Sequence, residues 1–148
     1  MGGAFRRIGA VVTGLVASAA VVAVVEALGA RVYPLPPGID PSNMQAVKAH
    51  MAQMPVGAFI FVLAAWALGA AAGPWVATRL SPSRVAVHGT IVGVILLAMC
   101  IANMVMLPHP IWFWIAALIV VPICAILGSR AAVAPEPDRI ARYAAYGA

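Results

Sequence analysis

The sequence predicts an all-α polytopic membrane protein, a bundle of four transmembrane helices with a short interfacial helix in its outer loop. Apolar residues make up 64% of the 148 residues, only 9% are charged, and the mean hydropathy is +1.02. Soluble domains usually carry about 25% charged residues, so this chain has too few to cover a water-exposed globule. These values exclude a cytosolic enzyme, a disordered tail and a nucleic-acid-binding module.

Four apolar segments are long enough to cross about 30 Å of hydrocarbon. Glu26 is the one charged residue within them, whereas the surface helix of a soluble protein carries a charged face. A signal peptide cleaved near Ala17-Ser18-Ala19 is an alternative for the first segment, but the apolar run continues to Val25 and favours a retained helix. The predicted membrane domain covers residues 1–128, with spans at 8–28, 56–77, 85–107 and 111–128.

The distribution of Lys and Arg predicts that both termini are cytoplasmic, because short cytoplasmic loops retain basic residues. We therefore read the net charge of +5 as a topology signal in a bacterial inner membrane and not as a nucleic-acid surface. The outer loop is then 29–55, and the tail 129–148 is cytoplasmic. The basic residues on the inner side are Arg6, Arg7, Arg79, Arg84, Arg130, Arg139 and Arg142, against Arg31 and Lys48 outside.

The outer loop is predicted to contain a short helix. Residues 33–38 are rich in proline, which makes the chain extended and stiff before Asp40, the expected N-cap, and Pro41 at the first helical position. A methionine-rich stripe then follows with helical spacing, and we expect it to pack on the bundle. A soft-metal path is the alternative, but such sites need thioethers that converge with Cys or His. The stripe consists of Met44, Val47, Met51 and Met54.

Small residues at GxxxG spacing indicate close helix packing in the membrane. Gly69 and Gly73 lie in the second span, and Gly89 and Gly93 in the third. Such spacing lets two backbones approach each other, either within the bundle or between two copies, and the sequence leaves both open. Trp66 falls near mid-membrane, where we expect it to pack or face lipid and not to stack on a ligand.

Four polar residues are predicted to form a cluster on the outer side. Glu26 lies near the end of the first span, where the helix dipole opposes a carboxylate, so we expect it to pair with Arg31 or to serve an ion or proton path. If the first and third spans are neighbours, Asn103 and His109 share its level, with His50 as a fourth member. A Glu/His pair can bind a divalent metal or relay a proton; the alternative is that these residues tie the loops to the helix ends.

No catalytic, cofactor-binding or metal-binding motif is found in the sequence. GxSxG, HExxH and phosphate-binding loops do not occur, and Cys100 and Cys124 lack CxxC or Cys/His spacing. We therefore predict no catalytic residue, no cofactor and no metal.

The chain resembles a widespread group of small bacterial four-span proteins to which no activity is assigned. The resemblance covers residues 8–130 and is carried by Glu26, the proline-rich run 33–38, Pro55, Gly69 and the segments Ile101–Met104 and Leu107–Phe113. It implies the four-span topology and supplies no function.

Three functions are compatible with these features. The one we favour is a non-catalytic membrane component, embedded in the lipid bilayer, that binds a partner membrane protein or a second copy of itself. The second is an oligomeric carrier of ions, protons or small solutes that uses Glu26, His109 and Asn103. The third is a membrane enzyme with an outer metal site.

Overall fold

The computed structural model describes residues 2–40, 42–81 and 86–133, which form five helices and no strand. Four of these helices are long and apolar enough to cross a membrane. The predicted all-helical membrane bundle is therefore confirmed, and the chain is an integral membrane protein. The helices are α1 (Gly2–Val32), α2 (Met44–Met51), α3 (Val56–Leu80), α4 (Val87–Met106) and α5 (Ile111–Ala132).

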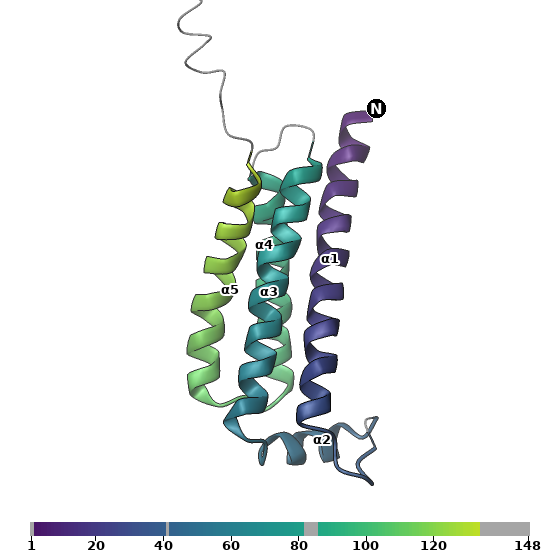
Figure 1. Ribbon diagram of the computed structural model, residues 1–148, viewed down its shortest axis with the longest axis vertical. Coiled ribbons are helices and arrows are strands. Elements are labelled where there is room, and N and C mark those ends of the chain that lie inside the picture. The colour runs from purple at the N-terminus through teal and green to yellow at the C-terminus, as the bar shows by residue number, and fades with distance from the viewer. Residues whose placement is uncertain (1, 41, 82–85, 134–148) are drawn as a thin grey trace, which may run out of the picture.

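Helix α3 is the central element of the bundle. It packs against α1, α4 and α5, whereas α1 and α5, as described, do not touch each other. Helix α1 stands at one edge of the bundle, packs mainly along α3 and meets α4 over a shorter stretch (Figure 1). The side of α1 that faces away from α3 is therefore covered by no other described helix.

The α1–α3 contact is close because both helices present glycine to it. The Ser18 hydroxyl donates a 2.8 Å hydrogen bond to the Gly69 carbonyl. A Cβ added at Gly73 would overlap the Ser18 hydroxyl and lie 2.6 Å from the Gly14 carbonyl oxygen. The sequence left open whether this motif packs within the bundle or between two copies. Gly69 and Gly73 pack within the bundle of one chain.

The second glycine motif also packs inside the bundle. A Cβ at Gly89 would overlap the hydroxyls of Thr78 and Ser129, and one at Gly93 would lie 2.8 Å from the Ala125 side chain. These contacts join α4 to α3 and α5. The glycines of both motifs therefore serve packing within the bundle, as expected in lipid, where no hydrophobic force drives helices together.

Helix α2, which lies in the loop predicted to be the outer one, begins later than the sequence predicted. Asn43 is its N-cap, and the side-chain oxygen accepts hydrogen bonds from the backbone N–H groups of Gln45 and Ala46. Asp40 instead binds Ser42 through both the backbone N–H, at 2.9 Å, and the hydroxyl, at 2.7 Å. These bonds lower the pKa of Asp40. The predicted cap was wrong because an Asx turn at Asp40 and a cap at Asn43 have the same local sequence signature.

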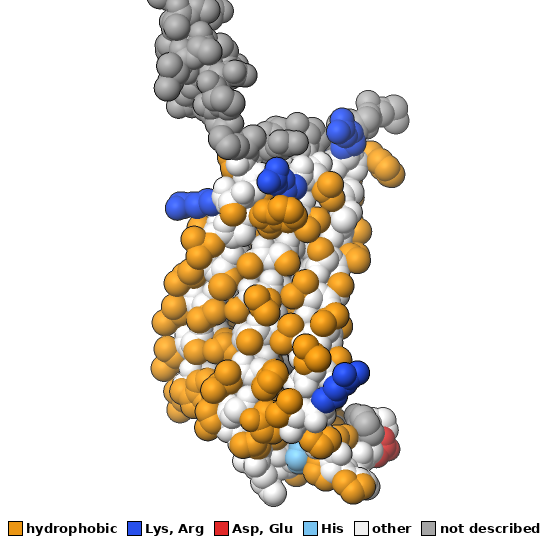
Figure 2. Space-filling view, viewed as in Figure 1, with side chains coloured by type: hydrophobic (Ala, Val, Ile, Leu, Met, Phe, Trp, Pro, Cys, Tyr) orange, Lys and Arg blue, Asp and Glu red, His pale blue; other side chains and the backbone are white. Residues whose placement is uncertain are grey.

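The surface of the bundle divides into an apolar body and charged ends. Exposed apolar side chains cover the length of the spans, as a lipid-facing surface requires (Figure 2). Helix α1 continues to Val32 and α5 to Ala132, beyond the predicted span ends at Leu28 and Gly128. Parts of the predicted inner side fall outside the described residues, namely Arg84 and tail residues 134–148.

Candidate functional site

Glu26 lies on α1 toward the α2 end of the bundle, which is the end predicted to be the outer one. Since α1 ends at Val32, the carboxylate is about 9 Å inside the end of the helix. It lines a cavity of about 210 Å³ with Tyr33, Met54 and other side chains of α1 and α3. The Trp66 side chain lies close to the carboxylate, and no charged group of the described chain pairs with it.

The predicted pairing of Glu26 with Arg31 is not formed. Residues five apart on a helix point about 140° away from each other, so the two side chains leave α1 in different directions. Within one chain, therefore, neither of the two charges neutralises the other.

His109 is held in the short α4–α5 connection between two prolines. Its Nδ1 lies 3.0 Å from the Leu107 carbonyl oxygen, which accepts the hydrogen bond when Nδ1 carries the proton. That tautomer leaves Nε2 as the acceptor. The ring stacks on Phe113 with a 4.7 Å centroid distance and a 27° interplanar angle. Burial lowers the pKa of His109, and the bond to Leu107 partly opposes this.

Trp66 connects the two outer residues. It is only 7% exposed and lies close to Glu26, and its ring lies 6.1 Å from that of His109 and 5.3 Å from that of Phe113. Trp66 is therefore a packing residue, one of the two roles expected from the sequence. Its position next to both Glu26 and the His109 ring could not be predicted, because it depends on α3 lying between α1 and α5.

The other two members of the predicted cluster lie apart from this arrangement. The Asn103 side chain is exposed on α4 and lines neither of the two outer cavities described, since α1 runs mainly along α3. His50 is half-buried on α2 and likewise lines neither. The structure thus brings Glu26 and His109 to one indole and leaves Asn103 and His50 outside that contact.

The methionine stripe meets His109 at a second outer cavity. This cavity of about 280 Å³ is lined by Met51, Met54, Phe59 and His109 with its flanking prolines. Met51 and Met54 also pack against the hydrophobic core, which confirms the packing role for these two residues. In the described chain, no three His, Cys, Asp or Glu side chains converge as they would to hold a metal.

No family model, curated protein or solved structure matches the chain. The site therefore has to be interpreted from its own geometry.

Proposed function

We propose that the chain is a non-catalytic membrane component that associates with a second copy of itself through α1. The observation that carries this proposal is an exposed face of small residues along α1, flanked by two opposite charges that have no partner of opposite charge within the described chain. We call it the α1 face. Its members are Gly9, Thr13, Val16, Ala20, Ala23, Ala27 and Ala30, all of them exposed.

The α1 face has the spacing of a helix-pairing seam. Its members follow each other at alternating intervals of four and three residues, the heptad pattern of the a and d positions. It lies opposite the side that packs on α3, where Gly14 and Ser18 are buried. A Cβ added at Gly9 would meet no atom within 4 Å, so a neighbouring backbone has room to approach.

The outer surface of α5 shows how a lipid-facing helix of this bundle looks. Its large side chains, such as Ile115, Ile119 and Ile123, are 50–57% exposed. The α1 face instead presents alanine, glycine and threonine, with the 62% exposed Val16 as its one larger member. Because small side chains give close backbone contact and little surface for lipid, this difference favours a protein neighbour over lipid.

Charge complementarity favours a second copy as that neighbour. In the heptad of the α1 face, Glu26 precedes an a position and Arg31 follows a d position, which makes them g and e residues. In a parallel helix pair, a g residue of one helix meets the e residue five positions later in the other. Two copies in one membrane share the same orientation, so their α1 helices are parallel around a two-fold axis. The Glu26–Arg31 ion pair, which does not form within one chain, then forms twice between the two chains.

We also infer the orientation of the chain from the charges at its two ends. Arg6, Arg7, Arg79 and Arg130 belong to the end where α1 begins and α5 ends, and the basic side chains visible there form a rim (Figure 2). Arg31 and Lys48 belong to the end with α2. The excess of basic residues supports a cytoplasmic location for the first end, in agreement with the resemblance to small bacterial membrane proteins.

The test is the monomer–dimer equilibrium of labelled protein in liposomes, read by energy transfer at increasing dilution. Ala20→Ile adds bulk to the α1 face, where overpacking of about 1–3 kcal/mol should raise the dimer Kd at least about fivefold. The matched control is Ala98→Ile on α4, which adds the same bulk at another exposed position and should change nothing. Equal energy transfer for both variants and the native chain would contradict the proposal.

A charge exchange tests the register. Glu26→Arg and Arg31→Glu each place like charges opposite one another and should weaken the dimer. The double variant restores opposite charges in reversed order and should recover most of the association. A double variant that associates no better than either single variant would refute the Glu26–Arg31 contact between copies.

A further inference from the structure

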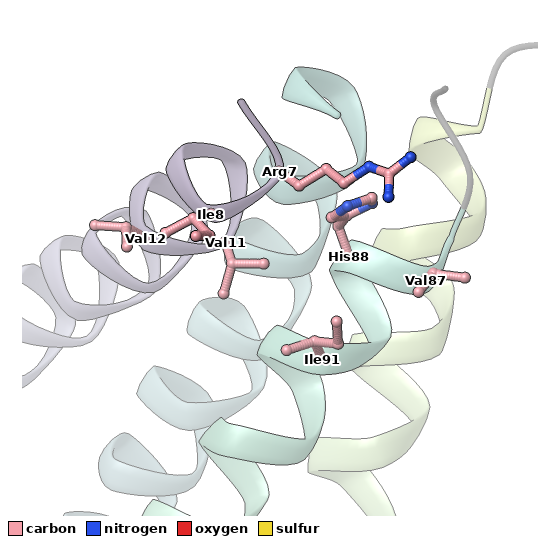
Figure 3. A pocket seen from close by; sticks show the side chains of 7 residues that line it. All are labelled: Arg7, Ile8, Val11, Val12, Val87, His88 and Ile91. Atoms are coloured by element: carbon pink, nitrogen blue, oxygen red, sulfur yellow. The ribbon is translucent and has the colours of Figure 1, made fainter. Parts of the chain in front are cut away.

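A third cavity, of about 580 Å³, opens between the N-terminal part of α1 and the first turns of α4 (Figure 3). It is about twice as large as the larger outer cavity and lies at the opposite end of the bundle. None of its residues belongs to the α1 face or to the outer cluster. The side chains that line it are Arg7, Ile8, Val11, Val12, Val87, His88 and Ile91.

Two nitrogen-bearing side chains meet at the mouth of this cavity. Figure 3 shows the Arg7 guanidinium next to the His88 imidazole. His88 is only 8% exposed, and its Nδ1 has no hydrogen-bond partner in the described chain. Buried polar atoms without partners are rare. Arg7 has donors only, so an acceptor between the two side chains would satisfy the guanidinium together with the imidazole in the tautomer that carries its proton on Nδ1.

The charge around the mouth favours an anion as this acceptor. Arg6, Arg79 and Arg130 lie at the same end of the bundle, whereas the acidic residues of the described chain, Glu26 and Asp40, lie toward the other end. A phosphate oxygen between the guanidinium and the imidazole would accept hydrogen bonds from both. Arg7 is exposed, so its long side chain is free to adjust to the group.

The walls of the cavity are aliphatic. Ile8 and Val12 of α1 and Ile91 of α4 are exposed by 42–65% and continue from the mouth toward the middle of the membrane. This surface belongs to two membrane-spanning helices and suits an acyl chain. A free anion would bind at the mouth and would not contact the aliphatic walls.

We propose that this cavity binds an anionic phospholipid, with its phosphate at Arg7 and His88 and an acyl chain along the α1–α4 walls. Basic pockets between transmembrane helices on the cytoplasmic side of a membrane bind anionic headgroups in the same way. With the orientation proposed above, the occupant is a lipid of the inner leaflet, selected by its charge and held by its chain.

The proposal is tested by native mass spectrometry of delipidated protein titrated with dioleoyl phosphatidylglycerol or dioleoyl phosphatidylcholine. The native chain should retain one anionic lipid in preference to the zwitterionic one. Arg7→Gln should raise the apparent Kd for phosphatidylglycerol about tenfold, the low end expected for one charge-assisted hydrogen bond. Arg6→Gln, the matched control, removes the same charge one residue away from a side chain that does not line the cavity, and should change the Kd less than about twofold.

A second variant tests the walls without changing the charge. Ile91→Trp fills the aliphatic part of the cavity and should reduce phosphatidylglycerol binding as much as Arg7→Gln does. Equal binding of the two lipids, or equal loss in Arg6→Gln and Arg7→Gln, would overturn the proposal. Complete competition by inorganic phosphate, together with unchanged binding in Ile91→Trp, would overturn it in favour of a simple anion site.

Discussion

The α1–α3 contact offers a direct test of the fold through Gly73→Ala. The added methyl group would overlap the Ser18 hydroxyl and lie 2.6 Å from the carbonyl oxygen of Gly14. Overpacking of this kind costs about 1–3 kcal/mol. Loss of the hydrogen bond from Ser18 to Gly69 adds about 0.6 kcal/mol, the average for such bonds between membrane helices.

The matched control is Gly9→Ala on the open side of α1. No atom of the same chain lies within 4 Å of a Cβ at Gly9, so at protein dilutions where α1 faces are not paired this variant gains only helix propensity, about 0.5–1 kcal/mol. Because Gly73→Ala has a similar propensity gain, the difference between the two variants isolates the packing cost. We expect Gly73→Ala to be less stable than Gly9→Ala by about 2–4 kcal/mol.

The assay is reversible unfolding in mixed micelles with increasing dodecyl sulfate, followed by tryptophan fluorescence. The double variant Ser18→Ala with Gly73→Ala removes the overlapping hydroxyl, so it should be more stable than the sum of the single effects by about 1 kcal/mol. Equal unfolding midpoints for Gly73→Ala and Gly9→Ala would show that α1 does not pack on α3 as described.

Three further predictions concern the outer side. The lowered pKa of His109 means that the native chain resists protonation of this ring, so stability should fall as pH drops below about 6.5; apparent Tm measured from pH 8 to 5 should flatten in His109→Gln and keep its slope in His50→Gln. Asn43→Ala should cost the outer helix about 1 kcal/mol, seen as faster amide exchange at the Gln45 and Ala46 N–H groups, while the spans stay protected. If the carrier hypothesis holds, proton flux in liposomes should drop in Glu26→Gln; identical flux in both proteins would remove that function.

The sequence predicted the elements that depend on composition. The four spans follow from hydropathy, because a helix needs about 20 apolar residues to cross the hydrocarbon core of a membrane. The packing role of Met51 and Met54 follows from periodicity. The predicted start of the outer helix at Asp40 was wrong, because two possible capping residues stand close together and only the fold decides which one the helix uses.

The candidate sites depend on helix order, which hydropathy does not encode. Trp66 links Glu26 to His109 only because α3 lies between α1 and α5. Asn103 stays apart for the same reason. His88 was likewise not predictable as a cavity residue, because its neighbour Arg7 is distant in sequence and belongs to another helix.

The position of α1 at the edge of the bundle gives this one helix two separate surfaces. The α1 face lies opposite α3, whereas the lipid cavity opens on the side toward α4, and the two sets of residues do not overlap. A substitution can therefore disrupt one surface and leave the other intact. We expect Ala20→Ile to lower dimer formation while phosphatidylglycerol binding stays unchanged, and Arg7→Gln to do the reverse, with native mass spectrometry reading subunit number and bound lipid in one spectrum. Simultaneous loss of both properties in either variant would show that the lipid bridges two copies, so that its binding and the pairing of α1 form a single site.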